Sequence, residues 1–173
     1  MGRNLTLMLA MVVALGAAPL MAAESPITDA TKGIFDGLKG NLTKAAEQVS
    51  EADYAFKATP EVRSLGQILA HVADANFAMC SGVAGKNPMS ESVEKTKTSK
   101  ADIQKALVDS FAFCEKAYAG LTDASAADMV EFFGSKRPKL GVLEFVNNHN
   151  AQHYGNIVTY MRLKGLTPPS SQR

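Results

Sequence analysis

Apolar residues recur every three or four positions in four stretches of the chain, the spacing that places side chains on one face of an α-helix. The first stretch covers residues 29–49, and its apolar face consists of Ile34, Leu38, Leu42, Ala45 and Val49. The second begins at Ser64, and its face consists of Leu65, Ile68, Val72, Ala75 and Met79. Each pattern predicts a helix with one side in a core.

Two further stretches repeat this pattern nearer the C-terminus. Residues 99–120 carry an apolar face of Ile103, Leu107, Phe111, Cys114 and Tyr118. Residues 139–164 carry a face of Val142, Val146, His149, His153, Ile157 and Tyr160. Two histidines therefore belong to the predicted buried side of the last helix.

Local signals mark the ends of these helices. Ser64 with Gln67, and Ser99 with Asp102, match the capping box, in which two side chains three residues apart satisfy free backbone amides at a helix start. Gly165 is placed to end the last helix, and two prolines follow it.

The segments between the predicted helices show no helical period: residues 50–63, 82–98 and 122–137. The second of these is long for a simple helix hairpin. In the third, we expect three apolar residues to cover one end of the core: Met129, Phe132 and Phe133. The chain has no tryptophan and no long alternation of β-branched residues, which leaves little for a sheet. The pattern predicts one all-α domain, a four-helix bundle.

Residues 1–23 have the pattern of a secretory signal peptide. Arg3 gives a positive start, residues 5–15 are almost all apolar, and small alanines precede Glu24. Cleavage after Ala22 or Ala23 would leave a domain of residues 24–173 in the periplasm or outside the cell. A retained N-terminal anchor is the alternative. No cysteine follows the apolar run, so a lipid anchor is not expected.

The charge balance bears on partners. The chain has 18 basic and 17 acidic residues, and removal of Arg3 with the signal segment leaves 17 of each. A neutral protein is a poor ligand for nucleic acid or an anionic membrane. We therefore expect a small-molecule substrate and no stable membrane association after cleavage. Pairing into a homodimer through a helix face stays open.

The histidines are the strongest candidate chemistry. The chain has three, and His149 and His153 lie four residues apart, so they share one face of a helix. His71 lies among apolar neighbours of another predicted helix. Three imidazoles on one divalent ion leave a coordination position open, as in catalytic metal sites. Asp74, one turn after His71, is a candidate to orient that imidazole. Alternatively, the pair is incidental and His71 is a hydrogen-bonded core residue.

Several segments together resemble the DinB-like superfamily of metal-dependent four-helix-bundle enzymes. They are the approach to the second helix at residues 56–64, Leu69-Ala70-His71, the segment 149–156 and the tail 162–169. The resemblance implies up-down-down-up connectivity with a long crossover between helices two and three. It also implies zinc or nickel on His71, His149 and His153. Some relatives carry an acidic residue just before the last histidine, where this chain has Gln152.

The resemblance leaves the reaction open. Characterised relatives include transferases and an isomerase that depend on low-molecular-weight thiols, which are cytosolic cofactors. Export of this chain favours a hydrolase over a thiol transferase. The alternative is a non-catalytic metal-binding or structural bundle. No residue stands out as a general base, so the catalytic residues beyond the metal ligands are not predicted.

The connectivity implied by the resemblance bears on the two cysteines. If helices two and three run parallel, Cys80, 16 residues after Ser64, and Cys114, 15 residues after Ser99, lie at nearly the same height. In an oxidising compartment such a pair favours a disulfide. The alternative is two buried thiols that act as small apolar side chains.

Overall fold

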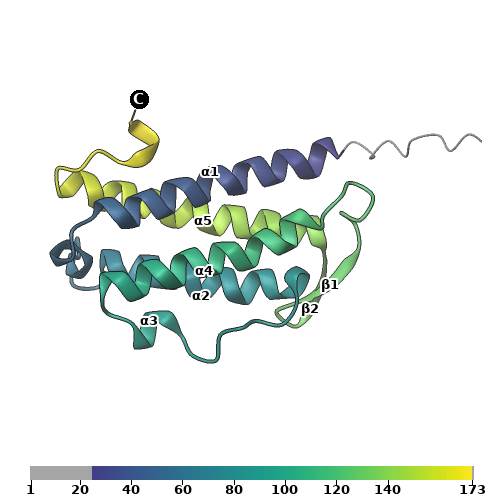
Figure 1. Cartoon of the computed structure of the whole chain (residues 1–173), viewed down its shortest axis with the longest axis horizontal. Coiled ribbons are helices and arrows are strands. Elements are labelled where there is room, and N and C mark those ends of the chain that lie inside the picture. Colours follow the sequence, from purple (N-terminus) through teal and green to yellow (C-terminus); the bar gives the residue numbers. More distant parts are fainter. Residues whose placement is uncertain (1–24, 173) are drawn as a thin grey trace, which may run out of the picture.

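The computed structural model describes residues 25–172, so the predicted signal segment, residues 1–23, lies outside the described part. Within it, four long helices lie side by side (Figure 1): α1 (Pro26–Gln48), α2 (Leu65–Ala84), α4 (Lys100–Ala119) and α5 (Lys139–Leu163). Short elements join or follow them: η1 (Ala52–Ala55), α3 (Val93–Thr96), β1 (Met129–Phe132), β2 (Ser135–Pro138) and η2 (Pro169–Ser171). The protein is mostly helical, as the sequence predicts.

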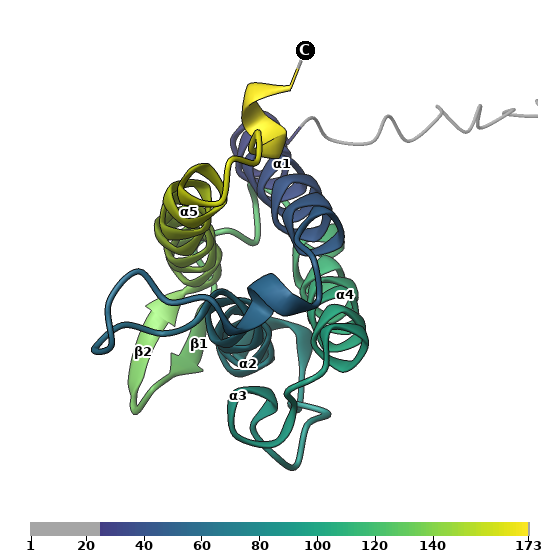
Figure 2. The ribbon, with the colours of Figure 1, turned by 90° about the vertical axis from the view of Figure 1, so that its left-hand side faces the viewer.

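Pairs of contacting residues give the relative directions of the helices. Asn76 of α2 donates a hydrogen bond to Ser110 of α4 at 3.2 Å, and the predicted disulfide joins Cys80 to Cys114, whose Cα atoms lie 5.3 Å apart. Residue numbers rise together in both helices, so α2 and α4 are parallel. End on, α2 lies between α5 and α4, and α1 lies opposite α2 (Figure 2).

The direction of α1 follows from its contacts with α4. Lys39 forms an ion pair with Glu115, and the Gln104 amide donates to the carbonyl of Ala46 at 2.8 Å. Residue numbers rise on one helix as they fall on the other, so α1 and α4 are antiparallel. Between residues 25 and 172, no helix combines the length and apolarity needed to cross a bilayer.

The predicted apolar faces hold for α4 fully and for α1 only in part. All five predicted face residues of α4 are buried, whereas Ile34 of α1 is 52% exposed and Phe35 is fully buried. Phe35 stacks on Tyr118 with ring centroids 4.1 Å apart and meets Phe111 edge-on. Aromatic packing against α4 thus decides which side of α1 faces the core.

The helix ends follow the sequence signals closely. Ser64 and Gln67 form both bonds of a capping box. Ser99 accepts from the Asp102 amide, but the Asp102 carboxylate bonds the Ser99 hydroxyl instead of its backbone amide, so this box is half formed. Gly165, with φ of 72°, ends α5, and the amide of Leu166 donates back to Met161 at 2.8 Å.

The all-α domain carries one small sheet that the sequence does not predict, an antiparallel hairpin at residues 129–138. Phe133 and Gly134 both have positive φ, as a two-residue turn between twisted strands requires. Phe132 is buried, but Met129 and Phe133 are 56% and 71% exposed, so Phe132 alone of the three predicted residues covers the core. A Cβ on Gly82 would lie 2.8 Å from the carbonyl oxygen of Glu131, so glycine there lets the hairpin approach α2.

Candidate metal centre

Three imidazoles converge where α2 and α5 pack together. His71 comes from α2, and His149 and His153 come from successive turns of α5. One potential ligand atom from each ring lies within 4.8 Å of the others. The ring centroids are 4.4 Å apart for the α5 pair and 4.9 and 5.2 Å from His71 to its two neighbours. The structure thus brings together the histidines that the sequence singles out.

The environment of the α5 histidines suits them as neutral ligands. Their Nδ1 atoms are buried and have no hydrogen-bond partner within residues 25–172. Burial is the main cause that lowers the pKa of each to about 4, and electrostatic interactions with the neighbouring imidazole of His71 and with Arg63 lower it further. Both rings are therefore uncharged at pH 7, the state in which imidazole binds metal. Two neutral imidazoles with orphaned nitrogens, beside a third imidazole, fit a divalent ion.

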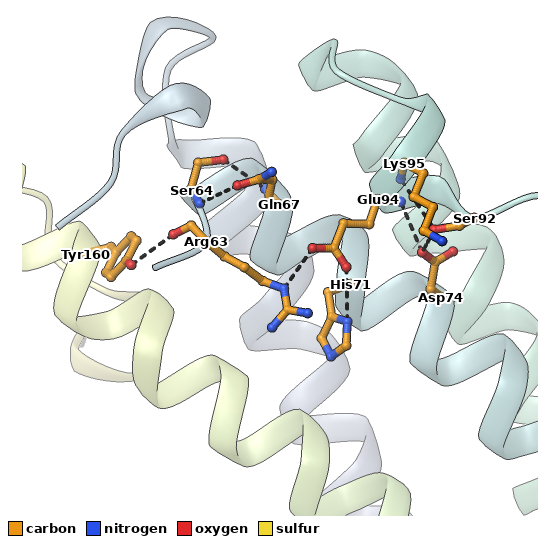
Figure 3. A network of polar contacts seen from close by, with 9 residues as sticks. All are labelled: Arg63, Ser64, Gln67, His71, Asp74, Ser92, Glu94, Lys95 and Tyr160. Carbon is orange, nitrogen blue, oxygen red and sulfur yellow. Dashed lines mark hydrogen bonds and ion pairs between the residues drawn. The ribbon is translucent and has the colours of Figure 1, made fainter. Parts of the chain in front are cut away.

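A carboxylate from the crossover faces the third histidine. Glu94 of α3 places one oxygen 3.3 Å from Nδ1 of His71 and accepts a 2.8 Å hydrogen bond from Nε of Arg63 with the other (Figure 3). A carboxylate on Nδ1 holds that proton and leaves Nε2 for an ion. Sequence reasoning missed Glu94 because the aperiodic crossover also contains Glu91 and nothing in the pattern distinguishes the two.

The structure corrects the role predicted for Asp74. Its carboxylate accepts hydrogen bonds from the Ser92 hydroxyl at 2.6 Å and from the amides of Val93 and Glu94 at 2.6 and 3.0 Å. Free amides at the start of α3 attract the carboxylate more strongly than an imidazole on its own helix. Asp74 therefore anchors the crossover, and Glu94 takes the position beside His71 that was predicted for Asp74.

An open cleft of about 500 Å³ adjoins the candidate site at His153. His153, Arg63 and Tyr160 contribute to its lining, together with Asn156. The Tyr160 hydroxyl donates to the backbone carbonyl of Arg63 at 2.9 Å and so fastens the loop before α2 to α5. The cleft gives a small molecule a route to His153, one of the three imidazoles.

Other polar residues of the 149–156 segment have separate environments. Asn150 is fully buried, and Gln152 is exposed. The Tyr154 hydroxyl bonds Ser170 at 2.9 Å in the C-terminal tail. Tyr154 thus secures the tail.

The sequence was compared with models of known protein families and with curated proteins. The family model of the DinB superfamily matches residues 34–157. A comparison with curated proteins finds no match.

Solved structures share the fold at low sequence identity. A DinB-like protein from Bacillus cereus is 23% identical, with a TM-score of 0.69 over 82% of this chain and 95% of the other. A DinB-like protein from Bacillus subtilis is 20% identical, with a TM-score of 0.62 over 83% of this chain and 99% of the other. A mycothiol-dependent maleylpyruvate isomerase is 14% identical, with a TM-score of 0.61 over 75% of this chain, which spans 60% of that longer protein.

Proposed function

Because the chain belongs to the DinB superfamily, we propose that it is an exported metal-dependent enzyme whose His71, His149 and His153 bind one divalent ion. The observation that carries this proposal is the convergence of three imidazoles, two of them neutral with buried, unpartnered nitrogens. Nitrogen ligands favour zinc or nickel over magnesium or calcium. The proposal includes up-down-down-up order for the four long helices, supported by the pairings of α2 with α4 and α1 with α4.

The proposed reaction is hydrolysis of a small molecule in the cleft. The ion would polarise a substrate carbonyl and lower the pKa of bound water. Glu94 would hold the His71 ring and its Nδ1 proton, and Asp74 would hold Glu94 in place through the start of α3. Tyr160 and Arg63 would fix one wall of the cleft. Nucleic acid is not a proposed partner.

A thiol-dependent reaction is the second candidate. It is favoured by the structural likeness to the mycothiol-dependent maleylpyruvate isomerase. Export opposes it, because such thiols are cytosolic. A panel of ester, amide and thiol-requiring substrates, each assayed with the metal-loaded and the metal-free protein, separates the two. Loaded protein that turns over none of them would favour a non-catalytic metal-binding bundle.

Substitution of Glu94 by glutamine is expected to weaken zinc binding by roughly 10- to 100-fold, because a neutral amide holds the His71 proton less strongly than a carboxylate. Competition with a chromophoric chelator measures the affinity. Glu91→Gln is the matched control, since Glu91 is an exposed acid of the same crossover. Equal affinities of the Glu94 and Glu91 variants would contradict the role given to Glu94.

Export is expected to remove the signal segment. Intact-mass analysis of the protein from the periplasm or medium should find a chain that begins at Ala23 or Glu24. A chain that keeps residues 1–20 in the membrane fraction would contradict export with cleavage, and with it the preference for hydrolysis.

A further inference from the structure

Arg63 is a cation fixed beside the three histidines. Its backbone carbonyl is held by Tyr160, and its Nε donates to Glu94 at 2.8 Å. Its side chain is 45% exposed and lines the cleft together with His153. These two contacts at opposite ends of Arg63 restrict its position, and the ion pair with Glu94 uses only Nε of the guanidinium. A pre-positioned guanidinium loses little freedom when a ligand binds.

Arg63 lines the same cleft as His153 and keeps free donors on its guanidinium. The contact with Glu94 uses Nε, so both terminal Nη groups are left for another partner. Figure 3 shows the Arg63 guanidinium beside the His71 ring, with the Glu94 carboxylate in contact with both. One molecule that reaches His153 from the cleft can therefore also reach the guanidinium, because both side chains line the same cleft.

The rest of the cleft lining complements a small anion with an apolar part. Its apolar wall is formed by three side chains: Ala58, Val62 and Ile68. The one acid of the lining, Glu61, is exposed at the rim, and hydrogen bonds from its own backbone amide and from Thr59 hold its pKa below the usual value. Glu61 thus already has donors, and Arg63 is the cation of the lining.

We propose that Arg63 binds a carboxylate of the substrate while the reacting group lies against His71, His149 and His153. This inference rests on the function proposed above and narrows its substrate class. A planar carboxylate accepts two parallel hydrogen bonds from the Nη groups, which neutral substrates cannot match. The substrates are small acyl compounds with a free carboxylate a few bonds from the carbonyl that reacts, such as half-amides or half-esters of short dicarboxylic acids.

Two matched hydroxamates test the inference by calorimetry on the zinc-loaded protein. Succinic monohydroxamate carries a metal-binding hydroxamate and a carboxylate, and its carboxamide analogue has the same length without the charge. The wild type is expected to bind the acid roughly 10- to 100-fold more tightly than the amide. Arg63→Gln should bind both probes about equally. Arg63→Lys keeps the positive charge but cannot donate two parallel hydrogen bonds, so it should show an intermediate preference for the acid. Arg162→Gln, an arginine of α5 outside the cleft lining, should keep the full preference.

Each result separates a binding role for Arg63 from a supporting one. If Arg63 only supported Glu94, its loss would weaken both probes equally and leave their ratio unchanged, which would overturn the inference. A wild type that binds both probes equally would also overturn it and leave the metal centre standing. Protein that takes up no zinc would overturn the metal centre and the inference together, and zinc-loaded protein that binds neither probe would overturn the inference alone. If Arg63→Gln does not fold, the ratio in Arg63→Lys decides, because a full preference there contradicts bidentate binding.

Discussion

Reduction of the Cys80–Cys114 disulfide is expected to lower the free energy of unfolding by about 3–4 kcal/mol, because the cross-link closes a loop that spans a sequence separation of 34. The cross-link restricts the unfolded chain, which gains conformational entropy when the bond is broken. The closed loop includes the crossover that carries Glu94. After reduction, the unfolded crossover is no longer held in a closed loop. More conformational entropy is then lost when folding brings Glu94 back to His71.

Equilibrium denaturation of the metal-free protein with and without reductant measures this loss. Metal-free protein is used because a bound ion would add its own stabilisation. The Cys80→Ala/Cys114→Ala variant should lose at least as much stability as the reduced wild type and should not respond to reductant. Thiol titration of the denatured, unreduced protein should find no free thiol. Two free thiols, or a loss below about 1 kcal/mol on reduction, would contradict the prediction.

The sequence predicts those parts of the fold whose signals are local. All five predicted apolar face residues of α4 are buried, and the Ser64–Gln67 pair starts α2 as a capping box does. The histidine pair is predictable for the same reason, since helical spacing alone stacks His149 on His153. The face of α1 is harder, because Ile34 and Phe35 both fit a helical stripe. Contact with Phe111 and Tyr118 of α4 selects Phe35, and that contact is not a local property.

The parts that the sequence does not predict depend on contacts between distant segments. The backbone of the hairpin packs directly against Gly82 of α2, where a side chain would leave no room. No pattern within residues 129–138 reveals this contact. Glu94 reaches His71 because Asp74 holds the start of α3 against α2. A four-residue helix inside a polar crossover carries no periodicity. The ligands of the candidate site are therefore predictable, and the residue that orients one of them is not.

Replacement of His71 by alanine is expected to abolish stoichiometric metal binding. His149 and His153 would remain as a two-ligand site on one helix, and the loss should exceed the 10- to 100-fold effect typical of an outer hydrogen-bond partner. His149→Ala and His153→Ala should behave alike. Asn156→Ala is the control, because Asn156 lines the adjoining cleft without being one of the three histidines. Elemental analysis after gel filtration and chelator competition give the stoichiometry and affinity.

Zinc should also raise the unfolding temperature of the wild type and of Asn156→Ala but not of the histidine variants, because zinc stabilises the folded state only where the three-histidine site is intact.

The stability of the metal-free protein is expected to depend on pH. The pKa of His149 and of His153 is about 4 in the fold, against ~6.5 in an unfolded chain. Below pH ~6.5 the two histidines are protonated in the unfolded chain but stay neutral in the folded protein. Their contribution to the free energy of unfolding is therefore fully present above that pH and is lost as the pH falls towards 4.

A double variant, His149→Asn/His153→Gln, isolates this effect because neither new side chain titrates. Its stability should change less than that of the wild type between pH 6.5 and 4 in urea denaturation of the metal-free proteins. The same variant should bind no zinc at pH 7, so one protein tests both the ligand role and the burial of the two rings. Zinc bound by His71→Ala with wild-type affinity would remove the three-histidine site, because the α5 pair would then suffice. The non-catalytic bundle would become the better interpretation of the fold.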